Sequence, residues 1–390
     1  MNILHILNSA HGGSALSTFE LITALASRGV RSSLVCFNNA DGRQREQIVN
    51  LVEGRVLFIP LYWMNKRLRA RWWKRPLLEL RALYQTWGGY KFQPQIAALI
   101  RRNNINLVHT STILNPEGAI AARRNRLPHV WHVRELIGPQ NHFQFYNYTA
   151  WSKYVQTHCN VLIANSNTTK ECLQPYFPAG QIRTIPNGID VERFSPRVHQ
   201  NRQSRVVAML GSVTTRWKNH AFFIRVAHAL RQTPNVLFRI YGSLPAETDG
   251  YYQWLRKLNE PYQTVEFVAF DRPENIMREI DVLFHPSLYE SFGRIYAEAM
   301  AAGVPIVAVR AGSATELVED GENGYLVPSD DVDLAAARIL NLLESSELRN
   351  QMGARGRKKV LAEYSLTLLA DRMTGLYEKL IKESGGQVAP

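Results

Sequence analysis

The sequence predicts an α/β protein with two consecutive domains, each built on a parallel sheet. Short apolar runs rich in β-branched residues alternate with helical patterns, and this alternation pauses near residues 190–204 before it restarts. A length of 390 residues suits two domains. We expect a first domain over 1–190, a linker over 191–204, a second domain over 205–364, and a C-terminal helix over 365–390 that packs back toward the first domain.

The elements follow this order along the chain. In the first domain, buried strands are predicted at residues 2–7, 33–37, 107–110, 129–132 and 161–165, with helices at 17–28 and 94–103 among them. A Pro-Asn-Gly turn at residues 186–188 and the polar stretch 195–204 interrupt regular structure. In the second domain, strands are predicted at residues 205–210, 236–241, 265–267, 282–285 and 306–309, and the chain ends in a helix over 365–384.

Composition indicates the cellular compartment in which the protein is expected. No run approaches the roughly 20 apolar residues that cross a bilayer, and the apolar opening is interpreted as a first strand and not a signal peptide, because it lacks a basic lead and a cleavage site. The three cysteines, Cys36, Cys159 and Cys172, show no metal-binding or disulfide spacing. We therefore expect a cytoplasmic protein without a structural metal.

The positive charge is concentrated in the first half of the chain. Residues 1–190 contain 22 Lys and Arg but 9 Asp and Glu, whereas the remaining residues contain 24 of each kind. In the densest run, 61–75, six cations and three tryptophans stand without an acidic residue, and four leucines follow up to residue 83. Such a run suits an anionic membrane interface, nucleic acid or a solvated face. We expect peripheral membrane contact through 61–83 and no nucleic-acid partner.

Two glycine-bearing loops are candidate anion sites. Gly12 and Gly13 open the first predicted helix, where glycine lets the backbone approach a ligand and free N–H groups attract an anion. Gly211 follows the first strand of the second domain, and its loop carries Arg216 and Lys218, two cations able to neutralise a diphosphate. Taken alone, either loop could simply connect a strand to a helix.

The segment 285–305 is more informative. A strand is predicted to end at His285 and a helix to start near Ser291, so that the amides of Phe292 and Gly293 could cradle a phosphate. Glu290 would stand just before the helix and Glu298 two turns into it, on broadly similar sides and about 12 Å apart along it. Glu298 stands among apolar residues, and a buried glutamate needs a ligand or a partner such as an arginine.

These motifs resemble those of the GT-B glycosyltransferases, and within them the large family 4 of retaining enzymes. Glu290 and Glu298, with seven residues between them, are similar to that family's E-x7-E motif, and HPS, ESFG, EAMA and NGYLV stand around them as in the family. IPNGID and the RFSP that follows resemble its interdomain connection. The resemblance spans nearly the whole chain. It implies two Rossmann-like domains whose sheets face each other across a cleft.

The resemblance also implies roles for the candidate residues. Glu298 would bind the ribose and Glu290 the donor sugar, while Lys218 would neutralise the diphosphate of a nucleotide-sugar. The remaining candidates would line the phosphates, and these are Gly12, Gly13, Gly211, Phe292 and Gly293. His132, at the end of the strand over 129–132, would lie beside the donor sugar and a saccharide or lipid-linked acceptor. The implied activity is transfer in cell-surface polysaccharide or glycolipid synthesis.

One position departs from the family's pattern. Ser212 stands where the family usually has an arginine directly after the glycine, which leaves Arg216 or Arg294 to supply the charge and puts diphosphate binding in doubt. No convincing metal-ligand pair is present, because the acidic run 330–333 is interpreted as a helix cap. Lys218 and Arg216 are therefore expected to replace a metal, and no cofactor is expected beyond the donor. Retention of anomeric configuration is implied by the resemblance alone.

Three other functions fit parts of the sequence. A nucleotide-sugar epimerase shares the two-domain fold but needs no acceptor. A catalytically inactive GT-B binding module is compatible with Ser212. A nucleic-acid-binding protein would explain the basic charge but not Glu290 and Glu298, because carboxylates repel phosphates.

Overall fold

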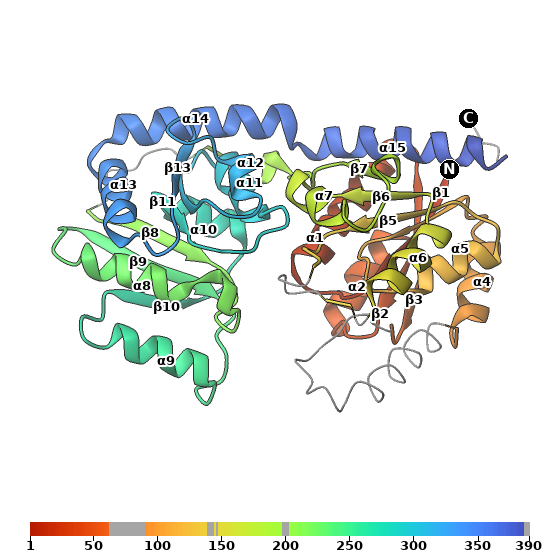
Figure 1. Ribbon diagram of the computed structural model, residues 1–390, viewed down its shortest axis with the longest axis horizontal. Helices are drawn as coiled ribbons and strands as arrows, with labels where there is room; N and C mark the ends of the chain where they lie inside the picture. The colour runs from red at the N-terminus through yellow and green to blue at the C-terminus, as the bar shows by residue number, and fades with distance from the viewer. Residues whose placement is uncertain (62–89, 139–143, 146, 197–202, 386–390) are drawn as a thin grey trace. The chain divides into compact units, whose positions relative to one another are not determined.

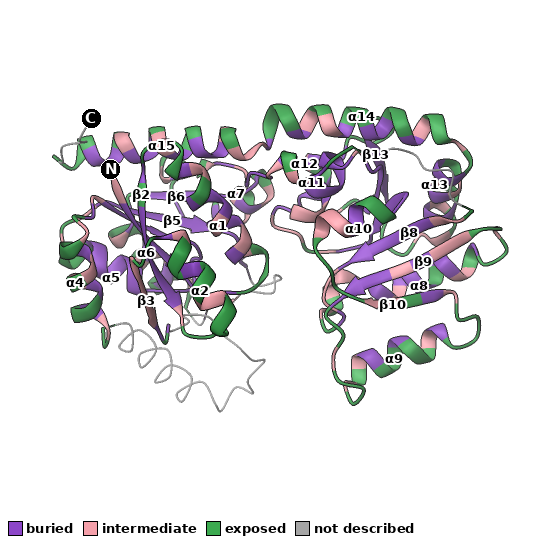
Figure 2. Cartoon of the chain, turned by 180° about the vertical axis from the view of Figure 1, so that it is seen from behind, coloured by how far each residue is buried: buried purple, intermediate pink, exposed green. Residues whose placement is uncertain are grey.

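The computed structural model describes residues 1–61, 90–138, 144–145, 147–196 and 203–385. The chain forms two compact units, Met1–Gly188 together with Leu366–Pro390 (unit 1) and Ile189–Ser365 (unit 2). In each unit a parallel sheet is buried between helices, as the purple strands of Figure 2 show. The segment 61–83 lies outside the described residues apart from Leu61, so its membrane contact stays a prediction.

The sheet of unit 1 has seven strands in the order β3-β2-β1-β4-β5-β6-β7, and every neighbouring pair is parallel. The strands are β1 (Asn2–Leu7), β2 (Arg31–Phe37), β3 (Val56–Ile59), β4 (Leu107–Thr110), β5 (His129–Val133), β6 (Val161–Ala164) and β7 (Ile182–Thr184). The chain builds the sheet in one direction from β1 to β3 and then in the other from β4 to β7. This reversal puts β1 and β4 side by side at the centre, with Ile3 opposite Leu107.

Helices cover both faces of this sheet (Figure 1). They are α1 (Gly12–Ala26), α2 (Gly42–Leu51), α4 (Gln93–Arg102), α5 (Glu117–Arg124), α6 (Tyr148–His158), α7 (Asn167–Leu173) and α15 (Leu366–Glu383). The amphipathic α15 buries Leu369, Met373 and Tyr377 in the same core as Ile3 and Leu107, so the end of the chain belongs to the core of unit 1. The opposite face packs against α4 and α5.

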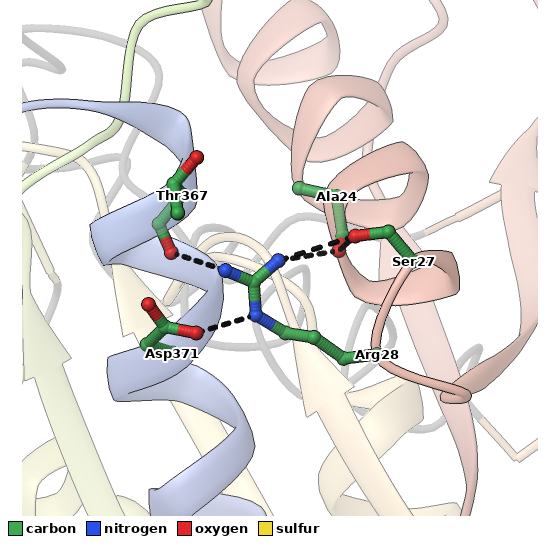
Figure 3. Close-up of polar contacts among 5 residues, drawn as sticks. All are labelled: Ala24, Ser27, Arg28, Thr367 and Asp371. Atoms are coloured by element: carbon green, nitrogen blue, oxygen red, sulfur yellow. Dashed lines mark hydrogen bonds and ion pairs between the residues drawn. The ribbon is translucent and has the colours of Figure 1, made fainter.

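Arg28 fastens α1 to α15 (Figure 3). Its Nε donates to Asp371 Oδ1 at 2.6 Å, and its Nη2 donates to the carbonyl of Thr367 at 2.8 Å. Its Nη1 donates to the carbonyl of Ala24 and to Ser27 Oγ, at 3.0 and 3.2 Å. The guanidinium thus pairs with the Ala24 carbonyl in the last turn of α1, where helices leave carbonyl groups unpaired, and with a carbonyl and a carboxylate near the start of α15.

Unit 2 has a six-stranded parallel sheet in the order β10-β9-β8-β11-β12-β13. Its strands are β8 (Arg205–Leu210), β9 (Val236–Gly242), β10 (Val265–Ala269), β11 (Val282–His285), β12 (Ile306–Val309) and β13 (Gly324–Val327). Its helices are α8 (His220–Ala229), α9 (Gly250–Asn259), α10 (Pro273–Glu279), α11 (Arg294–Ala301), α12 (Ala314–Leu317), α13 (Val332–Glu344) and α14 (Ser346–Glu363). Here too the order reverses once, between β8 and β11.

The predicted strands are present, with ends that differ by at most two residues, while β3, β7 and β13 were not among those predicted. Part of the predicted linker belongs to unit 2, because Val191 and Phe194 are buried in its core. Asp331 caps α13 by accepting a hydrogen bond from the Leu334 amide at 3.0 Å, which confirms that this acidic run is a helix cap. None of the helices formed by described residues has the length and apolar character required to cross a membrane.

Candidate active site

The carboxyl edge of the unit 2 sheet carries two loops at the point where the strand order reverses. β8 has β9 on one side and β11 on the other. In open parallel sheets, ligands bind in the crevice that opens where the loops after two adjacent strands run in opposite directions. The loops that follow β8 and β11, residues 211–219 and 286–293, begin at this edge. They form the candidate site of unit 2.

An ion pair between Lys218 and Glu290 joins these loops. Lys218 ends a short 3-10 helix, and its Nζ contacts Glu290 Oε1. His285 Nε2, at the end of β11, lies 3.1 Å from the same carboxylate oxygen. The Lys218 and Glu290 side chains are mostly buried, with exposed fractions of 20% and 14%. Gly211 leaves room for the lysine, because a Cβ there would lie 3.3 Å from the Lys218 side chain.

The surroundings of Glu290 favour its ionised form. Burial by itself would raise the pKa of the carboxyl group, but the Lys218 ammonium and the His285 hydrogen bond outweigh burial and hold the pKa of Glu290 well below its usual value. Burial, together with the Lys218 charge, lowers the pKa of His285, although Glu290 acts in the opposite direction. At neutral pH the cluster therefore holds an ammonium, a carboxylate and a neutral imidazole.

Glu298 lies on α11, the helix that leaves this site. Its side chain is 5% exposed, and its Oε1 accepts a hydrogen bond at 2.6 Å from Arg294 Nε, one turn earlier. The carboxylate thus has a structural partner, which a buried charge requires. The pairing also holds the carboxylate within one turn of the start of the helix. This geometry is compatible with both roles considered for Glu298, a contact to a ligand and a structural ion pair with Arg294.

The helix start was predicted three residues too early. α11 begins at Arg294, and Gly293 precedes it as the N-cap residue with a left-handed φ of 67°. A Cβ on Gly293 would lie 2.3 Å from the Tyr296 ring, so glycine is needed for both reasons. Glu290 therefore lies in the loop before the helix, as predicted, but residues 290–293 are not helical, so a spacing calculated for continuous helix from Glu290 to Glu298 does not apply. Phe292 is buried in the core of unit 2.

Arg216 and Lys218 do not converge in the structure. Arg216 is exposed, and its guanidinium carbon lies 5.0 Å from the centre of the Tyr251 ring on α9. Tyr251 in turn stacks on Trp254, with ring centres 5.7 Å apart. Arg216 therefore makes a cation–π contact, while Lys218 faces Glu290. The two cations thus contact different groups in the structure, and their joint role at a diphosphate stays a prediction.

Ser212, which stands at the position of the usual arginine, takes part in a hydroxyl network. Its Oγ lies 2.9 Å from Thr214 Oγ1 and accepts a hydrogen bond at 3.0 Å from Ser243 Oγ. The loops after β8 and β9 approach closely here, because a Cβ on Gly242 would lie 2.1 Å from the carbonyl oxygen of Gly211. This part of the edge therefore carries hydroxyl groups where the family usually has a positive charge.

Unit 1 also has buried polar side chains at the carboxyl edge of its sheet. Asn8 follows β1, Ser111 and Thr112 follow β4, and Arg134 and Glu135 follow β5. Because β1 and β4 flank the reversal of strand order, the residues after these two strands lie at the switch point of unit 1, and those after β5 lie one strand further along. Glu135 accepts hydrogen bonds from Thr112 and from the Arg134 amide, yet burial raises the pKa of this carboxyl group.

His132 is completely buried in β5. Its Nδ1 accepts a hydrogen bond from Arg134 Nη2 at 3.5 Å, and Arg134 Nη1 donates to Asn187 Oδ1 at 2.7 Å. Its Nε2 has no hydrogen-bond partner among the described residues. Burial, and then the Arg134 charge, lower the pKa of His132 well below its usual value. The imidazole is therefore neutral at physiological pH.

Gly12 and Gly13 lie at the start of α1, beside the same switch point. Gly12 has a left-handed φ of 87°, and both residues are exposed. A Cβ on either residue would meet no atom within 4 Å. The packing therefore does not require glycine at these positions, whereas the conformation of Gly12 does. This leaves open space beside the first turn of the helix.

Sequence reasoning missed three residues of these sites. His285 was named only as the end of a strand, Arg134 was not singled out, and Arg294 was considered as a source of charge for the diphosphate but not as the partner of Glu298. Each acts through a partner: Arg294 through Glu298 one turn away, Arg134 through Asn187, and His285 through Glu290. The spacing of four residues between Arg294 and Glu298 was a readable signal for a helical ion pair.

Family comparisons agree with this two-unit arrangement. Residues 11–193 match the family described as Glycosyltransferase Family 4, and residues 190–359 match the family described as Glycosyl transferases group 1. Among solved structures, Anabaena HepE in complex with UDP and glucose aligns with a TM-score of 0.77 at 21% identity, covering 97% of this chain and all of that one. The pneumococcal O-GlcNAc transferase GtfA aligns with a TM-score of 0.71 at 14% identity, covering 97% and 99%. These likenesses show the GT-B fold.

Curated relatives are similar at the level of sequence. Spore coat protein SA of Bacillus subtilis is 23% identical, over 74% of this chain and 82% of its own length. The Escherichia coli UDP-Gal:alpha-D-GlcNAc-diphosphoundecaprenol alpha-1,3-galactosyltransferase is 25% identical, over 73% of this chain and 78% of its own. The phosphatidyl-myo-inositol mannosyltransferase of Mycobacterium tuberculosis is 30% identical, over 52% of this chain and 55% of its own.

Proposed function

The chain belongs to the family 4 glycosyltransferases, and we propose that it transfers a sugar from a nucleoside-diphosphate donor to a saccharide or lipid-linked acceptor. We further propose that this transfer retains the anomeric configuration and uses no metal ion. In such a transfer, the bond between the sugar C1 and the β-phosphate oxygen breaks, and a bond from C1 to an acceptor oxygen forms. The acceptor hydroxyl loses its proton, and the nucleoside diphosphate leaves with the bonding electrons. Negative charge on the β-phosphate therefore increases in the transition state.

The observation that carries the proposal is the Lys218–Glu290 pair at the switch point of unit 2. An ammonium aimed at the developing phosphate charge stabilises it, and an ionised carboxylate accepts hydrogen bonds from sugar hydroxyls. Loops after β8 and β11 bring one group of each kind to the same edge. The proposal assigns Lys218 to the diphosphate and Glu290 to the donor sugar, and Arg216, held over Tyr251, is a more distant source of charge.

The remaining candidates take roles around this pair. Glu298 is assigned to the ribose hydroxyls, which its place on α11 beyond the loop supports. The amides of Phe292 and Gly293, and Gly211 on the facing loop, are assigned to the phosphates. Gly12 and Gly13, with the open space beside them, are assigned to the same phosphates from unit 1.

The acceptor is assigned to the edge of unit 1 that holds His132. Three polar atoms there are buried without a hydrogen-bond partner among the described residues, namely Asn8 Oδ1, Ser111 Oγ and His132 Nε2. Such atoms cost free energy unless a ligand or water pairs with them, and a polyhydroxylated acceptor would supply the missing partners. The names of the Escherichia coli and Mycobacterium tuberculosis relatives, one a diphosphoundecaprenol-linked sugar transferase, favour a lipid-linked acceptor.

Replacing Glu298 with alanine is expected to weaken nucleotide binding about 10-fold to 100-fold, because a hydrogen bond to a charged group contributes roughly 1.5–3 kcal/mol. The test is a thermal-shift panel of UDP, GDP and ADP with their sugar derivatives. A ligand at 100 times its dissociation constant adds about 2.7 kcal/mol of stability, so the donor base shows as the largest shift. Exposed Glu260, replaced by alanine, serves as the control. Equal nucleotide affinity in a folded Glu298→Ala variant would leave Glu298 as a structural partner of Arg294.

Membrane contact of the segment 61–83 is expected to depend on charge. Replacing Arg69, Arg71, Lys74 and Arg75 by serine should reduce binding to anionic phosphatidylglycerol vesicles and leave binding to neutral phosphatidylcholine vesicles unchanged. Each cation near such a surface contributes about 1 kcal/mol, and salt should screen the attraction. Vesicle flotation measures both. Wild type and variant binding the anionic vesicles equally well would mean that this segment is a solvated basic face.

A further inference from the structure

His285 lies within hydrogen-bonding distance of Glu290, and its few other contacts do not account for a histidine at this position. It is the last residue of β11, and its side chain is fully buried. Its Nε2 lies 3.1 Å from Glu290 Oε1, whereas its Nδ1 has no hydrogen-bond partner among the described residues. The ring of Tyr296, also fully buried, lies at 82° to the imidazole with ring centres 5.3 Å apart. The ring is therefore held by packing, and among the described residues its hydrogen-bonding partner is Glu290.

Once a nucleotide-sugar is bound, Glu290 and the diphosphate compete for the Lys218 ammonium. In the structure it pairs with Glu290, but the proposed function requires its ammonium at the diphosphate. As Lys218 turns toward the phosphate, Glu290 loses its closest countercharge while it stays largely buried. A carboxylate in that situation must be held by another hydrogen-bond donor, or it reorients or takes up a proton. Among the side chains that the structure describes in contact with the Glu290 carboxylate, His285 is the donor that remains.

We propose that His285 is a positioning residue that holds Glu290 ionised and correctly oriented when Lys218 moves from Glu290 to the donor diphosphate. This inference rests on the proposed function. An ionised carboxylate has no proton to give, so His285 must carry its proton on Nε2 and donate it to Oε1. Because both observed contacts end on Oε1, the second oxygen, Oε2, can accept a hydrogen bond from a sugar hydroxyl.

The first test separates turnover from binding. His285→Leu should lower kcat about 10-fold to 100-fold with UDP-glucose or GDP-mannose, whichever the wild type turns over, because small misplacements of a catalytic group have effects of that size. The affinity for free UDP or GDP should change less than twofold. His285→Gln retains an N–H donor and should recover most of kcat. His228→Leu, at a half-buried histidine of α8, is the matched control and should keep wild-type kcat.

A double-mutant cycle with Glu290→Gln shows whether His285 acts through Glu290. In the Glu290→Gln background, His285→Leu should add less than twofold to the loss, since the group it positions has been altered. The acid limb of the pH–kcat profile should move to higher pH in His285→Leu, because the ionised carboxylate loses one of its donors. Lys218, His285 and Tyr296 face Glu290, and His220 at the start of α8 faces Lys218 and His285.

Nitrogen-15 NMR of histidine-labelled enzyme provides a readout that needs no activity. The His285 signals should report the tautomer protonated on Nε2 and should shift in Glu290→Gln. The opposite tautomer, wild-type kcat in His285→Leu, or equal losses in both Glu290 backgrounds would each overturn the proposal. A wild type that turns over none of the nucleotide-sugars would instead contradict the proposed function, and the two failures are therefore distinguishable.

Discussion

Lys218→Ala is expected to lower kcat about 10²-fold to 10³-fold, which is the usual cost of removing one preorganised group from a developing charge. Glu290 should change as well, because the Lys218 ammonium is a main reason that the pKa of Glu290 lies well below its usual value. Without it, burial dominates and the pKa of Glu290 rises. The variant should therefore lose its remaining activity at a higher pH than the wild type as the solution is acidified.

Two controls accompany this prediction. Lys257→Ala removes an exposed lysine of α9 and should leave kcat unchanged. EDTA should leave the wild-type rate unchanged, because the proposal assigns phosphate neutralisation to Lys218. Full activity in Lys218→Ala, or loss of wild-type activity in EDTA with recovery in manganese or magnesium, would contradict that assignment. Lys218→Arg keeps the charge but enlarges the group beside Gly211, and intermediate activity is expected.

The sequence predicted the strands that position Lys218 and Glu290, but not the contact between these two side chains. Alternating apolar runs locate β8 and β11 with correct ends, and both Lys218 and Glu290 were candidates. Seventy-two residues separate the two, and their contact depends on β8 and β11 being neighbours, which periodicity along one strand does not encode. The resemblance to a family linked them to one ligand, and the contact between the side chains came from the fold.

Errors in the site arise where backbone conformation overrides local pattern. Ser291 precedes an apolar run and is a typical helix start, yet α11 begins at Arg294 because Gly293 adopts a left-handed conformation and lies against Tyr296. Arg216 and Lys218 were both expected at the diphosphate because they stand in one loop. In the structure they have different partners, since Arg216 lies over Tyr251 of the aromatic pair on α9, one strand further along the chain, and Lys218 contacts Glu290.

A row of buried histidines in unit 1 predicts a large loss of stability in acid. His5 on β1 lies opposite His109 on β4, with ring centres 5.2 Å apart, and His109 stacks on His132 at 5.4 Å. Tyr377 of α15 closes the row, its hydroxyl 2.5 Å from His109 Nδ1. Burial lowers the pKa of His5 to about 3 and that of His129 on β5 to about 4, and it lowers the pKa values of His109 and His132 in the same direction.

The sign of the effect follows from proton uptake. Below about pH 6.5 the unfolded chain takes up protons on these histidines, whereas the folded chain does not, so the free energy of unfolding falls as pH falls. At pH 4.5, His5 and His129 should each cost roughly 2 to 3 kcal/mol, at about 1.4 kcal/mol per pKa unit. Together these costs match much of a typical stability of about 5–15 kcal/mol. Glu135, whose pKa is raised by burial, acts in the opposite direction but is a single group.

Replacing one member of the row should therefore move the acid unfolding midpoint. His5→Leu removes a titrating group whose Nδ1 has no hydrogen-bond partner among the described residues, while Ser32 loses a contact of 3.3 Å. Stability at pH 7 should change little, and the midpoint of acid unfolding should fall by several tenths of a pH unit. His11→Leu, at an exposed histidine before α1, is the matched control and should unfold at the wild-type pH. Circular dichroism follows the whole chain, and hydrogen exchange of β1 and β4 assigns the change to unit 1. Identical midpoints for His5→Leu and the wild type would mean that acid unfolding starts at other groups.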